Sequence, residues 1–524
     1  MTGAQTLIRT LVNSEVDVCF ANPGTSEMHF VAALDSVPEM RAVLALFEGV
    51  VTGAADGYGR MTGRPAATLL HLGPGLGNGI ANLHNARRAR TPIVNIVGEH
   101  ATYHQRFDAP LQSDIVALAG NVSKWVRVCA TSDDLTADAT DAVAAAVGPP
   151  GGIATLVVPA DVSWGTLAGT SARQRPVPPT GSVPADTIES VRKVLVSEEP
   201  VVILLGGRAL RERGLRAAAS IAEATAATLL AETFPARLER GGGLPTIERL
   251  AYLGEMAIGQ LASARHIILV DTAAPVSFFA YPGQPSELWP TGCELHVLAG
   301  PEHDVERSLE ALADAVWVSG SSQTDGLSMA PLAPLGRPRG PLTSVSLAAA
   351  IACMLPEGAV VVDESNTAGV FLSGATEGTP RHDWLCNTGG AIGQGLPVAT
   401  GAAIGAPDRP VLCIQADGSA MYTIQSLWTQ AREGLDVTTV ILSNRAYAIL
   451  NLELSRVGVG AGGPRAERML ELSSPDLDFV SLAQGMGVPA TRATTAEDLV
   501  VQLQHAVREP GPHLVEAVLP VGLG

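Results

Sequence analysis

Two short apolar runs separated by a helical pattern, between residues 409 and 444, constrain the fold of this chain more than any other feature. Residues 409–416 and 437–442 have the length and composition of buried strands, and residues 422–432 carry apolar side chains at helical spacing. The first run is followed by Asp417 and the second by Asn444. Such a strand–helix–strand unit predicts neighbouring parallel strands, whose carboxyl ends bring these two residues to one edge of an open α/β sheet.

Asp417 and Asn444 have the chemistry of magnesium ligands, because Mg²⁺ prefers hard oxygens and takes few of them from protein. We expect the carboxylate, the amide oxygen and a backbone carbonyl near Ala446 to share the ion with a diphosphate. The helix N-terminus at Gly418 and Ser419 offers N–H groups to the same diphosphate. The triplet Asp-Gly-Ser is by itself also a common turn with a helix cap. The spacing of 27 positions to Asn444 favours the metal site.

Proline-rich stretches divide the chain into three blocks, and 524 residues are enough for about three domains. Residues 175–184 and 320–341 are the expected linkers, which gives domains at 1–172, 185–320 and 342–524. All three blocks show strand and helix patterns. The 46% hydrophobic and 4% aromatic composition is typical of parallel sheets covered by helices. A faint internal repeat connects the first and third blocks.

Charge and cysteine usage exclude several classes of protein. The net charge of −18 argues against nucleic acid or an anionic membrane as a partner. The six cysteines have no short spacing, which indicates core residues in a reducing compartment rather than a disulfide or zinc framework. The amino terminus lacks the layout of a signal peptide, and no apolar run reaches membrane-spanning length. We therefore expect a soluble, cytoplasmic protein.

The Asp417–Asn444 pattern resembles the signature of thiamine diphosphate (ThDP) enzymes, Gly-Asp-Gly followed after 26 to 27 residues by Asn-Asn. Here Ala416 and Ser443 replace the first residue of each element. The resemblance extends over nearly the whole chain and is closest to the acetolactate synthase large-subunit and benzoylformate decarboxylase group. It implies an α/β fold in which two doubly wound parallel-sheet domains, pyrimidine-binding and diphosphate-binding, flank a Rossmann-like middle domain. It also implies the cofactors ThDP and Mg²⁺.

FAD is a further cofactor that the resemblance raises. Gly206-Gly207 and residues 241–243 lie where acetolactate synthases bind FAD, but neither forms a phosphate-binding loop. We expect FAD to be absent.

Glu48 is the expected catalytic acid of the cofactor site. It lies in the small-residue segment 46–60, in which we single it out as the one exceptional carboxylate. A buried carboxylate is costly unless it is partnered, so we expect the site to keep it available as an acid. The resemblance implies that it shares a proton with N1′ of the cofactor's aminopyrimidine. The alternative is a glutamate that starts a helix in contact with water.

Further cofactor contacts are implied by the resemblance. Ile392 would support the bent cofactor, and the carbonyl of Gly390 would accept from the 4′-amine. An ordinary core isoleucine is the alternative. The remaining expected contacts are Asn366, Thr367, Gly418, Ser419 and Tyr447. Turn chemistry alone would also explain Asn366 and Thr367.

The expected substrate residues come from the first block. His71 ends a predicted strand, aligns with the active-site histidine of benzoylformate decarboxylases, and titrates in a range suited to moving a proton. A structural histidine is the alternative. Thr25 matches the position of a substrate-binding serine in that family. His104, with His100 near it, is a further candidate in a polar loop.

Two departures from the family pattern bear on the reaction. In the loop 108–112 Pro110 replaces the Phe, and Leu111 the catalytic Gln, of acetolactate synthases. The stretch 277–283 lacks the second histidine of benzoylformate decarboxylases. Its Phe278, Phe279 and Tyr281 would form either an apolar substrate wall or core.

These residues together predict a ThDP- and Mg²⁺-dependent 2-keto acid decarboxylase or carboligase that resembles acetolactate synthase. The alternatives are a benzoylformate decarboxylase-like enzyme that does not ligate, and a 2-hydroxyacyl-CoA lyase, which would need a nucleotide site in the middle domain. A non-catalytic ThDP-binding paralogue is a further alternative, which Glu48 argues against. The resemblance implies a small 2-keto acid as substrate and a homodimer or homotetramer with active sites at subunit interfaces.

Overall fold

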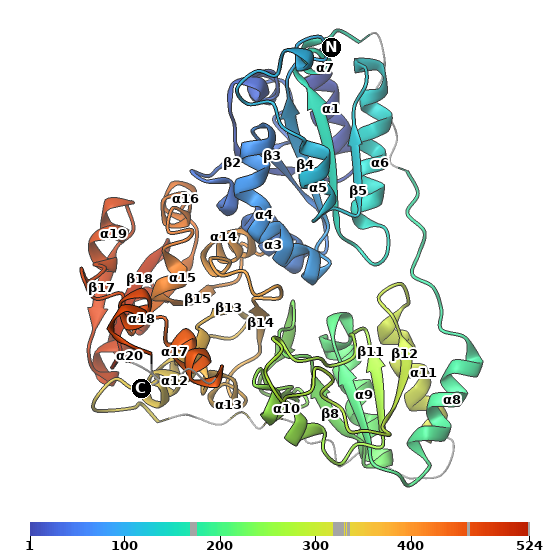
Figure 1. Cartoon of the computed structure of the whole chain (residues 1–524), viewed down its shortest axis with the longest axis vertical. Helices are drawn as coiled ribbons and strands as arrows, with labels where there is room; N and C mark the ends of the chain where they lie inside the picture. The colour runs from blue at the N-terminus through green and yellow to red at the C-terminus, as the bar shows by residue number, and fades with distance from the viewer. Residues whose placement is uncertain (168–174, 318–329, 331, 333–335, 458–461, 522–524) are drawn as a thin grey trace.

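The computed structural model describes residues 1–167, 175–317, 330, 332, 336–457 and 462–521. Three open sheets, each packed against helices, form three bodies that follow one another along the chain (Figure 1). The first body, in blue and cyan, lies above the green middle body and the orange and red third body. This arrangement confirms the expected α/β architecture.

The first body contains six parallel strands in the order β2-β1-β3-β4-β6-β5. Its strands are β1 (Val18–Asn22), β2 (Arg41–Leu44), β3 (Ala66–Leu70), β4 (Ile93–Glu99), β5 (Trp125–Val128) and β6 (Ile153–Pro159). Its helices are α1 (Gly3–Asn13), α2 (Met28–Leu34), α3 (Glu48–Thr62), α4 (Leu72–Ala89), α5 (Ile115–Gly120), α6 (Leu135–Val147) and α7 (Ala160–Trp164), with 3₁₀ turns η1 (Thr25–Glu27), η2 (Gln105–Phe107) and η3 (Ser132–Asp134). The central strands are buried along their whole length, because helices cover both faces of the sheet.

The middle body contains five parallel strands in the order β10-β8-β7-β11-β12. They are β7 (Val201–Leu205), β8 (Thr228–Ala231), β10 (Glu248–Arg249), β11 (His266–Val270) and β12 (Glu294–Ala299). The accompanying helices are α8 (Ala185–Leu195), α9 (Glu212–Thr225), α10 (Gly254–Leu261) and α11 (Val305–Trp317), with η4 (Gly207–Leu210).

The third body is a seven-stranded sheet in the order β17-β18-β16-β15-β13-β14-β9. Its strands are β13 (Ala359–Glu364), β14 (His382–Cys386), β15 (Val411–Ala416), β16 (Val437–Ser443), β17 (Ala490–Ala493), β18 (His513–Val518) and the antiparallel edge strand β9 (Leu238–Arg240). Its helices are α12 (Ser344–Met354), α13 (Leu372–Ala375), α14 (Gly395–Gly405), α15 (Asp417–Ala420), α16 (Ser426–Glu433), α17 (Ala448–Arg456), α18 (Pro464–Leu470), α19 (Phe479–Gly485) and α20 (Ala496–Ala506), with η5 (Asn366–Gly369). Because β9 comes from the middle of the chain, the second and third bodies share a sheet.

Most of the expected elements are present, with one correction in the first body. The sequence predicts that a strand ends at His71. In the structure β3 ends at Leu70, His71 is the N-cap residue, and α4 already begins at Leu72. Gly75 and Gly79 are buried in this helix, where its backbone lies against Glu48 and Thr52 of α3.

Helices α3 and α14 join the first and third bodies through direct backbone contact. A Cβ atom on Gly401 would lie 1.8 Å from the carbonyl oxygen of Ala54, and one on Gly57 would lie 2.1 Å from that of Val398. Real Cβ atoms do not approach so closely, so both positions require glycine at this helix spacing. The contact fixes α3, which begins at Glu48, against the third body.

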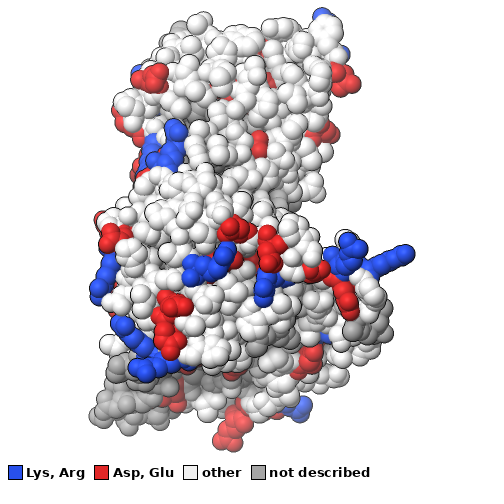
Figure 2. Space-filling view, turned by 90° about the vertical axis from the view of Figure 1, so that its left-hand side faces the viewer, with Lys and Arg blue, Asp and Glu red and all other residues white. Residues whose placement is uncertain are grey.

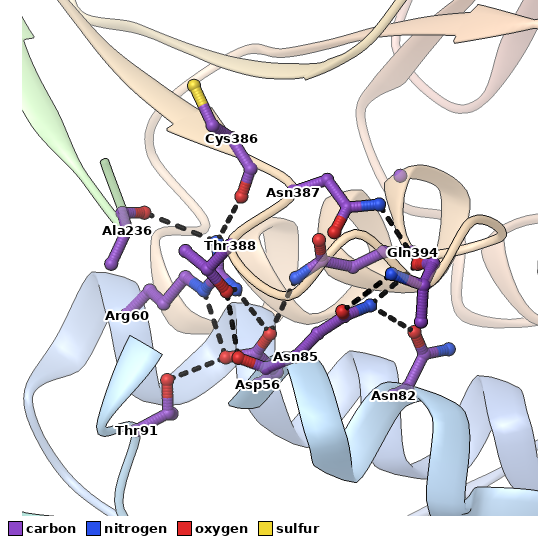
Figure 3. A network of polar contacts seen from close by, with 12 residues as sticks. Asp56, Arg60, Asn82, Asn85, Thr91, Ala236, Cys386, Asn387, Thr388 and Gln394 are labelled. Carbon is purple, nitrogen blue, oxygen red and sulfur yellow. Dashed lines mark hydrogen bonds and ion pairs between the residues drawn. The ribbon is translucent and has the colours of Figure 1, made fainter. Parts of the chain in front are cut away.

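Beside this contact, an ion pair between Asp56 and Arg60 connects all three bodies (Figure 3). Both side chains are almost completely buried, and the guanidinium donates to the carboxylate at 2.6 and 2.9 Å. Arg60 also donates to the carbonyls of Cys386, at 2.7 Å, and Ala236, at 3.3 Å. Asp56 accepts in addition from Gln394 at 2.8 Å. Segment 46–60 therefore holds a second buried carboxylate, and the expectation that Glu48 is its one exceptional acid is wrong.

Replacing Arg60 with Met should destabilise the protein by about 3–5 kcal/mol, because it leaves the Asp56 carboxylate buried without its cation. Urea unfolding followed by circular dichroism measures the loss. The double variant Asp56→Asn with Arg60→Met should recover part of it. Arg64→Met is the matched control, since Arg64 pairs with Asp17 and both side chains are 44% exposed. That change should cost less than about 1 kcal/mol. An equal loss in both Arg variants would contradict the prediction.

A second junction lies at the carboxyl ends of the middle strands. Arg90, at the end of α4, forms an ion pair with Asp271 after β11 and donates to its backbone carbonyl at 3.0 Å. Glu232, after β8, accepts from the N–H of Gly207 at 3.0 Å. Burial raises the pKa of Glu232 to about 7, against the opposing effects of the Gly207 N–H and Arg90.

This raised pKa predicts a pH-dependent loss of stability. Between pH 4.5, the ordinary pKa of a glutamate, and about 7, the folded state holds a proton on Glu232 that the unfolded state has released. The contribution of Glu232 to stability is therefore complete below pH 4.5 and falls as the pH rises to 7. Glu232→Gln removes this titration, so its melting temperature relative to wild type should rise between pH 4.5 and 8. A constant difference across that range would contradict the prediction.

The cysteines agree with the expectation that they do not form a disulfide framework. All six cysteines are free thiols, and four of them are buried. On the face shown in Figure 2, acidic and basic side chains are interspersed and much of the surface is uncharged. Within the described parts of the chain, every helix is too short or too polar to cross a membrane.

Candidate active site

The structure places Asp417 and Asn444 at neighbouring strand ends. Ala416, the last residue of β15, pairs with Leu442 of β16 in parallel register, and both polar residues follow directly. The Asp417 carboxylate accepts from the N–H groups of Gly418, at 2.7 Å, and Arg445, at 2.6 Å. Arg445 has a left-handed φ of 57°, which turns its N–H toward that carboxylate. The Asn444 side-chain oxygen accepts from the N–H of Ala446 at 3.2 Å.

Asp417 is a buried carboxylate without a cationic partner among the described residues. Burial raises its pKa, although the N–H groups of Arg445 and Gly418 act in the opposite direction. A divalent cation bound by this carboxylate, the Asn444 amide oxygen and a nearby carbonyl would compensate the buried charge with the hard oxygens that Mg²⁺ prefers. The residues present therefore fit a magnesium ion.

The turn beside Asp417 has little room for side chains. A Cβ atom on Gly418 would lie 2.5 Å from the ring of Tyr447. The Ser419 hydroxyl donates to the Ala416 carbonyl at 3.1 Å and accepts from Gln415 at 2.6 Å. The hydroxyl of Ser419 is thus engaged within the turn, which leaves backbone N–H groups as the donors suited to a diphosphate.

Asn366 and Thr367 begin η5, directly after Ser365 at the end of β13. Since β13 pairs with β15, this turn lies at the same sheet edge as Asp417. Asn366 is exposed with φ of 51°, while Ser365 donates to Asp363 at 2.6 Å. Local turn chemistry therefore engages Ser365 and Asp363 rather than Asn366 or Thr367.

The loop that carries Gly390 and Ile392 is held by Glu364, a residue that sequence reasoning did not select. Its buried carboxylate accepts from the N–H groups of Gly395, at 2.6 Å, and Gly393, at 2.7 Å, and from Gln415 at 2.9 Å. Burial raises the pKa of Glu364, and these donors oppose the shift. Glu364, at the end of β13, thereby connects the Ile392 loop to β15, the strand that Asp417 follows.

The first body contacts the other side of the same loop. Asn85 of α4 donates to the Ala391 carbonyl at 2.8 Å and accepts from the Ala391 N–H at 3.2 Å (Figure 3). Gly390 has φ of 77°, and a Cβ atom there would lie 2.6 Å from the ring of Phe278. Phe278 of the middle body therefore covers Gly390, and Ile392 is half-buried beside it.

Glu48 is the first residue of α3 and is buried. Its carboxylate accepts from the side-chain amide of Asn78 at 3.0 Å. A Cβ atom on Gly75 would lie 3.1 Å from Glu48 Oε1 and 3.3 Å from the Cβ of His71. Glu48 does start a helix, as the alternative interpretation proposed, but its side chain is buried rather than exposed to water. Glu48 and His71 both lie next to Gly75.

His71 is paired with a buried acid, Glu27, that sequence reasoning also missed. The Nδ1 atom of His71 lies 2.8 Å from Glu27 Oε2 and 3.2 Å from Ser26 Oγ. Glu27 and His71 follow β1 and β3, which are neighbours in the sheet. The sequence signal that could have identified Glu27 is the presence of a polar residue after each of two adjacent strands. Thr25 is exposed, and its neighbour Ser26 makes the contact with His71.

His104 lies apart from this cluster, on the exposed segment that contains η2. Its ring packs against those of His100, with centroids 5.5 Å apart, and Phe107, at 5.6 Å. Across the described chain, no hydrogen bond or ion pair connects His104 with His71.

The two groups of candidate residues make no direct polar contact with each other in the described part of one chain. Among the residues that the structure describes, no hydrogen bond or ion pair joins Glu48 or His71 to Asp417 or Asn444. Large apolar side chains lie exposed beside each group, Leu46 at 49% near Glu48 and Tyr422 at 53% after α15.

Comparisons with known proteins agree with this geometry. Family models described as the N-terminal and C-terminal TPP binding domains of thiamine pyrophosphate enzymes match residues 1–119 and 372–517. A Mycobacterium tuberculosis protein with the provisional name acetolactate synthase large subunit IlvX is 57% identical, with 100% of both chains covered. Benzoylformate decarboxylase of Pseudomonas aeruginosa is 30% identical, with 95% of both chains covered. The structure of the thiamine diphosphate-dependent 4-hydroxybenzoylformate decarboxylase of Rhodococcus jostii superposes with a TM-score of 0.84 at 25% identity, covering 100% of both chains.

Proposed function

The chain belongs to the thiamine pyrophosphate (ThDP) enzymes, and on this basis we propose that it is a ThDP- and Mg²⁺-dependent enzyme that decarboxylates a small 2-keto acid, with ligation to a second carbonyl as a further step. The observation that carries the proposal is the buried, uncompensated Asp417 carboxylate beside Asn444 at one sheet edge. When bound, ThDP supplies the nucleophilic carbon that adds to the keto group and accepts the electron pair left by CO₂.

The residues of the chain have separate roles in this proposal. Asp417, Asn444 and the Ala446 carbonyl would hold the metal, while the helix N-terminus at Gly418 and Ser419 would offer its free N–H groups to the diphosphate. Glu48 exchanges a proton with the aminopyrimidine, and the Gly390 carbonyl accepts from its amine. Further contacts to the cofactor come from Asn366, Thr367, Ile392 and Tyr447.

His71 moves a proton at the substrate. Glu27 binds its Nδ1 atom, which leaves Nε2 as the nitrogen for the substrate and fixes the orientation of the ring. Thr25 and His104 remain candidates for substrate contact.

The proposal is tested by titrating the purified protein with ThDP and Mg²⁺ under circular dichroism, and then measuring CO₂ release from pyruvate and from benzoylformate. Saturable binding that requires Mg²⁺, followed by CO₂ release, would support it. Absence of ThDP binding in the presence of Mg²⁺ would overturn it.

An aromatic cluster favours a second candidate, a benzoylformate decarboxylase-like enzyme that does not ligate. The rings of Phe234, Tyr252, Phe278 and Phe279 lie with centroids 4.9 to 6.0 Å apart, and Phe278 covers Gly390. Such a wall suits an aryl substituent on the keto acid. The substituted loop with Pro110 and Leu111 also lacks the amide that acetolactate synthases use beside the acceptor. Preference for benzoylformate over pyruvate, with no ligated product, would select this candidate.

We further propose a homodimer or homotetramer in which two subunits complete each active site. The support is that no hydrogen bond or ion pair joins the Glu48 group to the Asp417 group in the described part of one chain. The six free thiols fit a reducing compartment, and we propose that the protein is cytoplasmic.

We expect neither FAD nor a CoA-type nucleotide in the middle body. Glu232 and Asp271 place two carboxylates at the strand ends where a nucleotide phosphate would bind, and these acids would disfavour it. Arg90, the cation at this position, already forms an ion pair with Asp271. Absorption spectra and chromatography of heat-released cofactors would detect either molecule.

His71→Ala should reduce kcat about 100-fold while ThDP affinity stays within a few fold, because His71 moves a substrate proton and, among the described residues, has no hydrogen bond or ion pair to Asp417 or Asn444. Steady-state kinetics and ThDP titration measure the two effects. His505→Ala is the matched control, since this exposed histidine lies in α20. A parallel loss of ThDP binding in His71→Ala would show a structural role instead.

A further inference from the structure

Three potential metal-binding side chains converge at the beginning of β11 and β12, in the middle body. His266 is the first residue of β11 and pairs with Glu294, the first residue of β12. His296 lies two residues further along β12, so that it and Glu294 point to the same face of the sheet. The Nδ1 atom of His266 lies 3.2 Å from His296 Nε2, and Glu294 Oε2 lies 3.8 and 3.9 Å from these two nitrogens.

These separations are close to those of ligands around one ion. Two ligands at the usual distances from a tetrahedral zinc ion lie roughly 3.3 Å apart. The two nitrogens already meet this condition. Glu294 is 70% exposed, so a small rotation of its free side chain brings its oxygen closer.

A fourth residue orients the first ligand. Glu199, just before β7, lies with Oε2 2.8 Å from His266 Nε2. When Nε2 carries the proton and donates it to this carboxylate, Nδ1 keeps its lone pair facing His296 and Glu294. Carboxylates hold metal-binding histidines in this way, and the contact raises the basicity of the ligand nitrogen.

The charge and position of the cluster are also suitable for a cation. Two carboxylates and two imidazoles leave a negative site, and Glu199 and Glu294 are 51% and 70% exposed, which opens it to solvent. The cluster lies at the amino ends of the middle strands, whereas Gly207 and Asp271 lie at their carboxyl ends. The cluster is therefore distinct from the ThDP site and from the carboxyl ends of the middle strands.

We propose that His266, Glu294 and His296 bind one first-row transition-metal ion, for which Zn²⁺ is the probe, with water completing the coordination. The two imidazole ligands favour such ions over Mg²⁺. The bound ion would join β11 to β12 and, through Glu199, to the segment before β7. Its effect is on the stability of the middle body. The alternative is a hydrogen bond between the two histidines with no metal.

The experiment uses the full-length protein, freed of metal by a chelator and then saturated with Mg²⁺ so that the hard-oxygen site is filled. Zn²⁺ is titrated in competition with a chromophoric chelator, and Co²⁺ absorption reports the coordination. We expect the protein to bind one equivalent of Zn²⁺ with a submicromolar dissociation constant. His296→Ala and the mild surface change Glu294→Gln should each lower this affinity at least tenfold. Zn²⁺ should raise the melting temperature of wild type and not of these variants.

Two controls make the result specific. His303→Ala removes another partly exposed histidine of the middle body, paired with Glu302, and should leave Zn²⁺ affinity unchanged. Asp417→Asn should also retain the Zn²⁺ equivalent, which separates it from the ThDP metal. Equal affinity in wild type and His296→Ala, or wild-type binding only at high micromolar Zn²⁺, would overturn the proposal.

Discussion

Replacing Glu48 with Gln should lower kcat about 1000-fold while ThDP affinity stays within a few fold of wild type. Glutamine has the shape of glutamate, and its side-chain oxygen keeps an acceptor for Asn78, whose amide lies 3.0 Å from the carboxylate. It has no proton to exchange with the aminopyrimidine. The change therefore separates binding from turnover, which ThDP titration and CO₂ release measure on the same samples.

Glu223→Gln provides the matched control, because Glu223 is exposed on α9, far along the chain from both groups of site residues. Its kinetics should equal those of wild type. Turnover by Glu48→Gln within tenfold of wild type would remove Glu48 from the mechanism. A loss of ThDP binding as large as the loss of turnover would make it a structural residue.

Asp417→Asn should weaken ThDP binding in the presence of Mg²⁺ at least about 100-fold, equivalent to about 3 kcal/mol. The amide is neutral and offers the ion one oxygen in place of a charged carboxylate. Without Mg²⁺, the diphosphate would lose the cation shared with Asp417 and would keep only weaker partners such as the backbone N–H groups. Isothermal titration calorimetry with ThDP at several fixed Mg²⁺ concentrations measures the loss of ThDP affinity. The same titrations show whether this loss depends on the metal.

The fold should survive this change. Burial raises the pKa of Asp417, so removing its charge relieves a cost in the folded metal-free protein. The asparagine amide can accept only one of the two backbone N–H bonds that the carboxylate accepts. Because these two effects oppose each other, the melting temperature should change little. A correctly folded Asp417→Asn protein with full ThDP affinity would show that the metal lies elsewhere.

The two inactive variants also test the proposed subunit arrangement. If each site takes Glu48 from one subunit and Asp417 from the other, a hybrid dimer has one intact site and one doubly mutated site. Equal mixing with free exchange makes half of the dimers hybrids, so about a quarter of wild-type activity should return. No recovery in hybrids confirmed by mass spectrometry would place both residues in the same subunit's site.

The sequence predicted the parts of the site that follow from local pattern. Residues 409–444 show the strand–helix–strand rhythm directly, and the structure pairs β15 with β16 as the neighbouring parallel strands that this rhythm implies. Asp417 and Asn444 follow the two strands, as expected. The burial of Glu48 was also anticipated, because small apolar residues surround it in the chain.

The residues that sequence reasoning missed depend on contacts between distant segments. Asp56 and Arg60 are four apart on a helix, a spacing typical of a solvent-exposed ion pair. They are buried because Cys386 and Ala236, from the other two bodies, cover them. Glu364 belongs to this class, since its donors, Gly393 and Gly395, lie about 30 residues away. Hydrophobic periodicity carries no information about such partners.

The contact between α3 and α14 has a consequence for mutational surveys of this protein. At Gly57 and Gly401 a single added methyl group meets main-chain atoms rather than a side chain that could rotate away. In a library scored for abundance, alanine at either position should therefore be depleted as strongly as larger residues. Glu48→Gln should pass the same abundance screen and fail one for turnover. Variants at the two glycines therefore show, within the same screen, how much abundance is lost when the contact between α3 and α14 fails, independently of catalysis.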